Sequence, residues 1–293
     1  MTCEPQGPDP AVRDVVAGWL GPVRVVAVHS RGSTGTGVWQ VRAADGTLAA
    51  VRRYRDVDGR FGRELAAHTE VLDDLTGQDR FPRLLGADRE QRLLALGWLP
   101  GRPAEDHPAA ERPETYRQAG MLLARLHATG SRVDGDWEAA QDARTLALLD
   151  DDHRIAPAAV AALRRAIAAH EHPPVRVVPT HGDFVPRRWL LDDAGQLRVV
   201  GFGRYGWRPP VAELARLDAR ELTGRADLRA AVVEGYGADP FHGPTWRRAR
   251  LREAVRTAVR AYRAGARALE ARGHRLIDAA LADAAAAAPA AAC

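Results

Sequence analysis

The sequence predicts an α+β protein of two lobes, in which a small antiparallel sheet forms the N-lobe and a mainly helical region forms the C-lobe. Up to about residue 100, short runs rich in Val and Leu alternate with glycine-containing turns, as antiparallel strands do. Beyond that point, apolar residues mostly recur at the spacing of one helix face. We therefore expect a disordered lead, an N-lobe, a C-lobe and an alanine-rich tail at residues 1–12, 13–98, 99–276 and 277–293.

The N-lobe elements follow from local patterns. A short helix is expected at 11–21, where a glycine ends it. Three Val-rich strands follow, separated by the turns RGSTGTG and ADG, and two more strands close the lobe. The expected strands are 23–30, 37–43, 47–54, 83–88 and 92–100. Between the third and fourth strands, a crossing helix is predicted by apolar or aromatic residues at helical spacing: Phe61, Leu65, His68, Leu72 and Leu75.

The C-lobe begins with a helix that Pro113 opens and Gly130 ends. Residues 131–140 are predicted to form a polar loop. A strand is expected at 175–180, and a hairpin is expected around the turn DDAG at 192–195. The other expected helices are 141–151, 157–171, 211–222, 226–235 and 246–272.

Composition narrows the class of protein. Apolar residues make up 46% and charged residues 27% of the 293 residues, as in soluble globular proteins. No run approaches the ~18–20 apolar residues of a membrane span, and the N-terminus lacks the apolar core of a signal peptide. We therefore expect a cytoplasmic protein that binds no membrane. All 42 basic residues are arginine, but the net charge is only +4, so nucleic-acid binding is not expected.

No metal or disulfide is predicted. Cys3 and Cys293 lie at opposite ends of the chain, without clustered thiol or imidazole neighbours. The sequence HEH at 170–172 has metal-binding side chains, but no further ligand cluster stands near it.

Several short motifs occur in a characteristic order. A glycine- and hydroxyl-rich turn precedes a basic strand end, and then come a helix with a glutamate, the hinge LGWLPG and the helix QAGMLLARLHATG. The motif HGD and a later GFGR complete the series. Each motif is weak alone, but in this order, over about residues 20–275, they resemble the aminoglycoside phosphotransferase family, which shares the protein-kinase fold.

The resemblance implies transfer of a phosphoryl group from ATP, with Mg²⁺ held by an Asp and an Asn. Asp183 matches the catalytic aspartate that takes the proton of the acceptor hydroxyl, and His181 matches the histidine before it. Glu64 matches the helix glutamate that anchors a phosphate-binding lysine. Backbone N–H groups for phosphate are expected from the turn, at Gly32, Ser33, Thr34, Gly35 and Gly37.

The sequence departs from this pattern at three positions. The lysine position falls on Arg52, the Asn position on Arg188 and the metal-binding Asp position on Gly201. A guanidinium and a bare glycine provide no oxygen ligand for Mg²⁺. A positive charge at Arg188 also repels a cation, by ~4 kcal/mol per unit charge at ~4 Å and an effective dielectric constant near 20. We therefore predict no metal site and impaired catalysis.

Three compensations are conceivable. Asp192 or Asp193 could supply a ligand, although DDAG is a good turn. Glu213 could do so, but we expect it to hold the catalytic loop. Arg188 could replace the cation by pairing with Asp183 or with bound phosphate.

Two functions therefore compete. The first is a pseudokinase that binds ATP or another nucleotide, without normally ligated Mg²⁺, or a peptide or partner protein. The second is an active phosphotransferase acting on a hydroxyl of a small molecule or of a peptide Ser or Thr. Similar proteins occur in gene clusters for modified peptides such as lanthipeptides, so the resemblance makes a peptide substrate or a partner enzyme a candidate ligand.

Further candidates concern the surface and the tryptophans. Arginines at helical spacing predict a basic stripe on the last long helix, which is either a solvated face or a dock for an acidic partner: Arg252, Arg256, Arg260, Arg263 and Arg267. For Trp98 and Trp189, packing in the core or within a lobe is favoured over an aromatic platform for a ligand.

Overall fold

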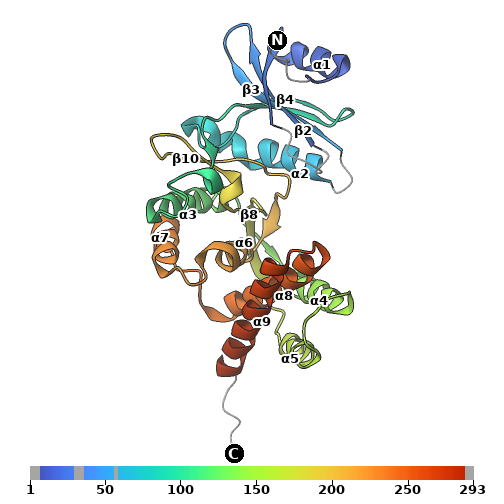
Figure 1. Cartoon of the computed structure of the whole chain (residues 1–293), viewed down its shortest axis with the longest axis vertical. Helices are drawn as coiled ribbons and strands as arrows, with labels where there is room; N and C mark the ends of the chain where they lie inside the picture. Colours follow the sequence, from blue (N-terminus) through green and yellow to red (C-terminus); the bar gives the residue numbers. More distant parts are fainter. Residues whose placement is uncertain (1–6, 30–35, 56–58, 288–293) are drawn as a thin grey trace, which may run out of the picture.

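The computed structural model describes residues 7–29, 36–55 and 59–287, which form two lobes stacked along the long axis of the molecule (Figure 1). The N-lobe contains a five-stranded antiparallel sheet, and the C-lobe is mostly helical, so the predicted α+β class is confirmed. The sheet order is β1-β2-β3-β5-β4. Its strands are β1 (Val23–Val28), β2 (Thr36–Ala43), β3 (Leu48–Tyr54), β4 (Leu84–Asp88) and β5 (Leu93–Gly97).

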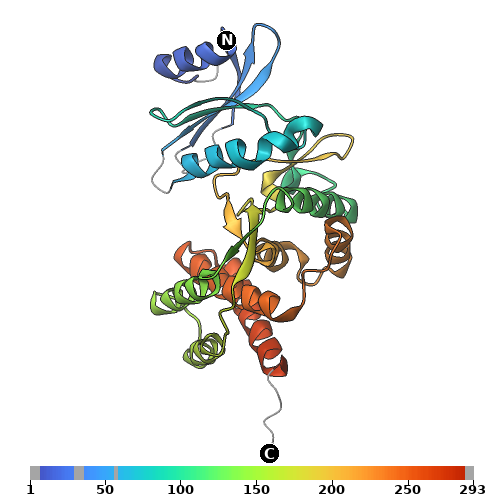
Figure 2. The ribbon, with the colours of Figure 1, turned by 180° about the vertical axis from the view of Figure 1, so that it is seen from behind.

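Alternation along the strands gives the sheet two apolar faces, and each face is covered by a helix. Helix α1 (Pro10–Leu20) packs Val12 and Val16 on one face, together with Val51 of β3. Helix α2 (Arg60–Ala67) packs on the other face, where Leu65 meets Leu94 and Leu96. Figure 2 shows α2 running beneath the sheet, toward the C-lobe.

Helix α1 begins earlier than predicted. The Asp9 side chain accepts a hydrogen bond from the backbone N–H of Val12 at 3.0 Å, and Pro10 occupies the first turn. An Asp cap followed by proline favours a helix start. The last residues of the predicted disordered lead are therefore ordered, and Val12 is fully buried.

The crossing helix is also less regular than predicted. After α2, the chain widens into a π-helical turn, η2 (His68–Leu72), and then tightens into a 3₁₀ turn, η3 (Asp73–Gln78). The π turn still buries His68 and Leu72.

Seven helices and several short elements follow in the described part of the chain. The helices are α3 (Pro113–His127), α4 (Trp137–Asp150), α5 (Pro157–Ala168), α6 (Pro210–Leu217), α7 (Ala226–Tyr236), α8 (Gly243–Arg263) and α9 (Arg267–Ala287). The strands are β6 (Arg102–Pro103), β7 (Arg132–Asp134), β8 (Val175–Thr180), β9 (Trp189–Leu191), β10 (Leu197–Val199) and β11 (Gly206–Arg208). The short helical turns are η4 (Ala104–Asp106), η5 (Pro186–Arg188) and η6 (Asp218–Leu222).

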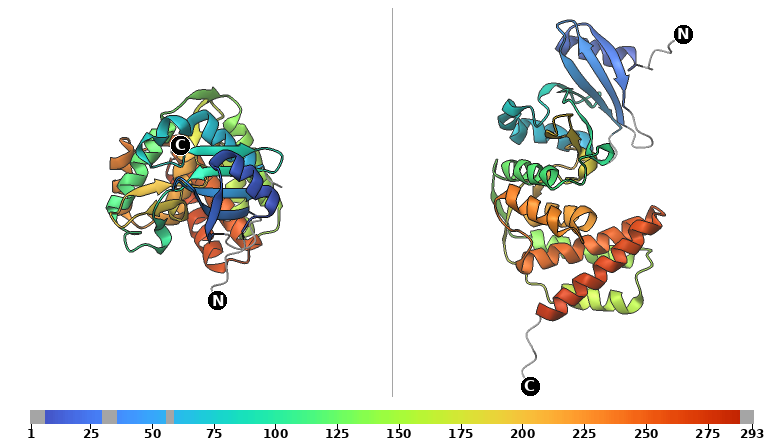
Figure 3. Two further views of the ribbon diagram at one scale, coloured as in Figure 1. Left: turned by 90° about the horizontal axis from the view of Figure 1, so that it is seen from above. Right: turned by 60° about the vertical axis from the view of Figure 1, so that its left-hand side comes forward.

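Two predictions for the C-lobe are wrong in detail. The predicted polar loop 131–140 contains strand β7, and helix α4 begins inside it. The predicted helix 246–272 is broken, because Gly265 adopts a left-handed conformation with φ +65°. Helix α9 folds back on α8, and Figure 3 shows the two helices packed along each other.

The predicted alanine-rich tail begins inside a helix. Helix α9 continues to Ala287 and so includes the first residues of the segment 277–293. Alanine has the highest helix propensity, and Ile277 is 1% exposed in the core between α5, α8 and α9. Within the described ranges, none of the helices has both the length and the apolar character needed to cross a bilayer.

Candidate functional site

The loop that carries His181 and Asp183 is fixed from both sides. It leaves strand β8, which pairs with β11 on one side and β7 on the other. Glu213 on α6 accepts hydrogen bonds from the backbone N–H groups of His181 at 2.9 Å and Gly182 at 2.5 Å. The prediction that Glu213 holds this loop is confirmed.

The His181 ring positions the loop and is not exposed to a substrate. Its Nδ1 lies 3.1 Å from the backbone N–H of Asp183, and its Nε2 lies 3.1 Å from the carbonyl oxygen of Val200. The first contact needs an acceptor and the second a donor, so the proton is assigned to Nε2. Burial lowers the pKa of His181, which keeps the ring neutral. The side chain is fully buried, with its ring centroid 4.5 Å from that of Phe202.

The carboxylate of Asp183 is surrounded by guanidinium groups. Arg187 Nη2 donates to both oxygens, at 2.6 and 2.8 Å, and Arg188 Nε donates to Oδ2 at 3.2 Å. Arg216 Nη2 lies 2.9 Å and Arg204 Nη1 lies 3.9 Å from Oδ1. Burial by itself raises the pKa of Asp183, but the four arginines outweigh it and lower the pKa to about 2. This carboxylate is therefore a weak base whose oxygens already have partners.

The Arg188 side chain lies where a side chain at Gly201 would begin. A Cβ atom built on Gly201 would lie 3.1 Å from Arg188 Nη1 and 3.2 Å from Arg188 Cδ. Gly201 has φ +87°, a conformation that side chains other than those of Asn and Asp rarely adopt. Arg188 therefore fills the space beside Gly201 into which a side chain at that position would project.

Above this loop, Arg52 and Glu64 form a buried ion pair. Arg52 Nη1 pairs with Glu64 Oε1, and the Tyr54 hydroxyl donates to Glu64 Oε2. Burial raises the pKa of Glu64, but Arg52 and Tyr54 outweigh it, so the pKa lies below its ordinary value. Glu64 is fully buried and Arg52 is 18% exposed. The predicted anchoring of a cation by Glu64 is confirmed.

Two cavities adjoin in the cleft between the lobes. One has a volume of about 350 Å³ and is lined by Arg52, Arg60, Arg187, Arg188 and Arg204, among others. The other has a volume of about 380 Å³ and is mainly apolar, with Leu96, Trp98 and Leu99 in its wall. Both are lined by His29, Val38, Arg52, Arg188 and Gly201. Trp98 is half-buried in the wall of the apolar cavity and packs on the ring of His29, whereas Trp189 is fully buried in the core, as predicted.

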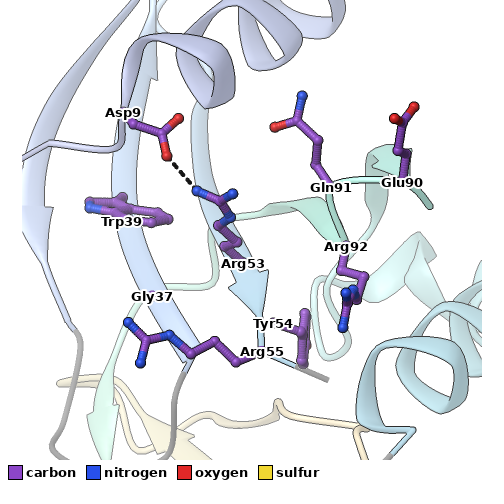
Figure 4. A pocket seen from close by; sticks show the side chains of 9 residues that line it. All are labelled: Asp9, Gly37, Trp39, Arg53, Tyr54, Arg55, Glu90, Gln91 and Arg92. Atoms are coloured by element: carbon purple, nitrogen blue, oxygen red, sulfur yellow. Dashed lines mark hydrogen bonds and ion pairs between the residues drawn. The ribbon is translucent and has the colours of Figure 1, made fainter. Parts of the chain in front are cut away.

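A third hollow of about 730 Å³ lies on the N-lobe sheet (Figure 4). Successive side chains of a strand point to opposite faces, so Arg53 points away from Arg52 and toward this hollow. There Arg53 pairs with Asp9. Gly37 also lines this hollow, and the ring of Trp39 lies over the place where a Cβ atom of Gly37 would be. In the sheet, Gly37 pairs with Arg53. The structure thus places Gly37 in strand β2. The other turn residues predicted to bind phosphate lie outside the described residues: Gly32, Ser33, Thr34 and Gly35.

The sequence of this chain matches a known protein family. The model of the phosphotransferase enzyme family matches residues 28–252. The chain belongs to this family. The resemblance to aminoglycoside phosphotransferases is thereby confirmed. No curated protein sequence matches the chain.

Solved structures of phosphotransferases share the fold. A macrolide 2′-phosphotransferase from Brachybacterium faecium is 20% identical with a TM-score of 0.60, over 91% of this chain and 96% of that one. A choline kinase from Streptococcus pneumoniae is 12% identical with a TM-score of 0.64, over 93% and 98%. A thermostable mutant aminoglycoside phosphotransferase, in ternary complex with AMP-PNP and hygromycin B, is 14% identical with a TM-score of 0.64, over 96% and 100%.

The metal ion of such phosphotransferases does not fit the residues of this family member. The two positions expected to provide oxygen ligands carry the Arg188 guanidinium and Gly201, and they lie against each other. Asp192 is engaged elsewhere, by Arg198 at 2.8 Å and by its own turn. In the ranges that the structure describes, no three His, Cys, Asp or Glu side chains are grouped to hold a metal. His170 and His172 instead both contact the carboxylate of Asp142.

The predicted basic stripe is not one exposed face. Arg252 is 11% exposed and pairs with Glu138 and Asp142, so it packs α8 on α4. Arg267 begins α9, beyond the break at Gly265. Of the remaining arginines, Arg256 pairs with Glu253 and Arg263 pairs with Asp151. Arg260 is exposed. The prediction of a continuous stripe is wrong because Arg252 packs against α4 and Arg267 lies beyond the break that ends α8.

The analysis of the sequence missed Arg187, Arg204 and Arg216. Arg187 follows Asp183 by four residues, a spacing at which a turn brings side chains together. Arg204 and Arg216 lie far along the sequence, and only the packing of α6 and of the turn after β10 brings them to Asp183.

We expect Asp183→Asn to cost more stability at neutral than at acidic pH. The pKa of Asp183 is about 2 in the folded chain, against an ordinary value of 3.8. Its contribution of about 2 kcal/mol is therefore present above pH 3.8 and disappears as the pH falls toward 2. Urea unfolding of wild type and variant between pH 7 and pH 3 measures this, with Asp193→Asn in the exposed turn as the control. A difference independent of pH would contradict the arginine stabilisation of this carboxylate.

Proposed function

We propose that this phosphotransferase-family protein is a pseudokinase, which binds a nucleotide between its lobes without a metal ion and does not transfer the phosphoryl group at an ordinary rate. The observation that carries the proposal is the position of the Arg188 side chain in the space that a side chain at Gly201 would enter. The expected place of a metal-binding carboxylate is therefore occupied by a positive charge. Since metal ions supply several kcal/mol of transition-state stabilisation, their loss slows transfer by orders of magnitude.

The cleft supports binding of a nucleotide. Its apolar cavity, walled by Trp98 and Leu96, suits a base, and Arg52 and Arg188, which line both cavities, can bind the phosphates. Guanidinium groups match phosphate oxygens with paired hydrogen bonds. Arg188 lines both cavities, so its positive charge lies between the cavity proposed for the base and the cavity proposed for the phosphates.

Calorimetric titration with AMP-PNP tests this proposal. We expect affinities in Mg²⁺ and in EDTA to agree within about twofold, because the protein provides the countercharge. Incubation with ATP and hydroxyl acceptors should leave no phosphorylated product detectable by mass spectrometry. Affinity that depends strongly on Mg²⁺, or a phosphorylated product, would overturn the proposal.

The alternative is an active phosphotransferase with rearranged ligation. The buried pair of Arg52 and Glu64 and the braced loop of Asp183 favour it, because both are parts of a working kinase site. A small molecule, such as an aminoglycoside, or a peptide Ser or Thr would then provide the hydroxyl. A peptide or a partner enzyme of modified-peptide biosynthesis stays a prediction from the family resemblance.

A further inference from the structure

The carboxylate of Asp183 is outnumbered by the guanidinium groups around it. Arg187, Arg188, Arg204 and Arg216 share this one carboxylate. Glu213 is occupied by the backbone of the loop, and Glu253 pairs with Arg256. Glu64 and Glu105 line the adjoining cavity, where Glu64 pairs with Arg52. The guanidinium groups that lie within ion-pair distance of Asp183 therefore outnumber this carboxylate four to one.

These arginines come from three parts of the fold. Arg187 belongs to η5, Arg204 to the turn after β10 and Arg216 to α6. Arg260 on α8 is close enough to Arg204 and Arg216 to affect them electrostatically. We call these four residues the arginine cluster: Arg187, Arg204, Arg216 and Arg260.

Within the cluster, like charges oppose one another. Burial lowers the pKa of Arg204, Asp183 raises it, and Arg216 and Arg260 lower it further, to about 10. Arg216 is 12% exposed, and its Nε has no hydrogen-bond partner among the described residues. Charged groups held together in this way are costly unless an anion joins them. Arg187 and Arg204 also line the 350 Å³ cavity, so an anion has room to reach the cluster.

We propose that the arginine cluster binds a phosphate group of a second ligand, beside the nucleotide, so that the molecule in the acceptor place is an anion and not an amine. Asp183 then acts as an internal counter-anion that holds the guanidinium groups in place. A phosphate dianion bound by Arg187 and Arg204, which line the cavity, would complete the neutralisation. A cationic ligand at the same place would face four positive charges across one carboxylate.

The proposal goes beyond nucleotide binding and is tested apart from it. Inorganic phosphate and glycerol 3-phosphate are titrated at constant ionic strength, with and without saturating AMP-PNP. The wild-type protein should bind phosphate with AMP-PNP present, and Arg204→Gln/Arg260→Gln should weaken that binding at least about tenfold. AMP-PNP affinity should change less than about twofold in this variant. Both substituted side chains are at least partly exposed, so folding should survive.

Two controls distinguish binding at the arginine cluster from nonspecific attraction of phosphate to a basic protein. Arg275→Gln, on an exposed position of α9, should leave phosphate affinity unchanged. Spermidine should not bind. Tighter binding of glycerol 3-phosphate than of inorganic phosphate would identify an ester as the ligand, and equal binding would identify the free ion.

Three outcomes would overturn the proposal: phosphate binding that AMP-PNP abolishes, equal phosphate affinity in wild type and double variant, or spermidine binding as tight as phosphate binding. If AMP-PNP does not bind at all, the pseudokinase proposal loses its nucleotide. The comparison of wild type with Arg204→Gln/Arg260→Gln then still decides whether the cluster binds phosphate.

Discussion

The double variant Gly201→Asp/Arg188→Asn is expected to bind ATP at least about tenfold more tightly in Mg²⁺ than in EDTA, a gain of about 1.4 kcal/mol that the wild-type protein lacks. The two substitutions restore a carboxylate and an amide oxygen at adjacent positions, and they remove the guanidinium that fills the space between. Asp tolerates a positive φ better than most residues, so Gly201→Asp adds less backbone strain than most other substitutions at φ +87°. Calorimetry with AMP-PNP in both conditions measures the effect.

The single variants are the controls. Gly201→Asp alone should gain no Mg²⁺ dependence, because Arg188 lies 3.1 Å from the new Cβ and would pair with the new carboxylate. Arg188→Asn alone should show little Mg²⁺ dependence of its nucleotide affinity, because it adds only one neutral ligand. A double variant as insensitive to Mg²⁺ as wild type would show that the metal is excluded by something other than this pair.

Arg52→Gln should lower the free energy of unfolding by about 3–5 kcal/mol, because it leaves Glu64 charged and buried without its partner. Glu64 is fully buried, and the remaining Tyr54 hydroxyl provides one hydrogen bond and no charge. Urea unfolding at pH 7 measures the loss. Arg53→Gln is the matched control one residue along the same strand. Its pair with Asp9 is 42% and 49% exposed, so its loss should cost about 0–1 kcal/mol.

Equal losses for the two variants would contradict the assignment of Arg52 to a buried pair. A large loss for Arg53→Gln would instead indicate that the cap of α1 depends on Arg53, since Asp9 both caps that helix and pairs with Arg53.

Local sequence patterns predicted those parts of the fold that depend on the order of apolar and polar residues within one strand or helix. The alternation along residues 47–54 fixed which side of β3 faces α1 and which faces α2. The patterns did not predict the break at Gly265, the π turn at His68 or the ordered end of α9. Glycine and alanine allow the break and the longer helix locally, but the packing of α9 on α8 selects them, and the pattern of one segment does not show that packing.

For the site, the sequence by itself determined the motif order and the loss of two oxygen ligands at Arg188 and Gly201, because a residue's identity decides whether it has a ligand atom. Only the tertiary structure decided that Arg188 lies in the space beside Gly201, and that Arg204 and Arg216 join Arg187 around Asp183. Electrostatic interactions depend on distance in space, and residues as far apart along the chain as Asp183, Arg204 and Arg216 come within 4 Å only when β8, β11 and α6 have packed.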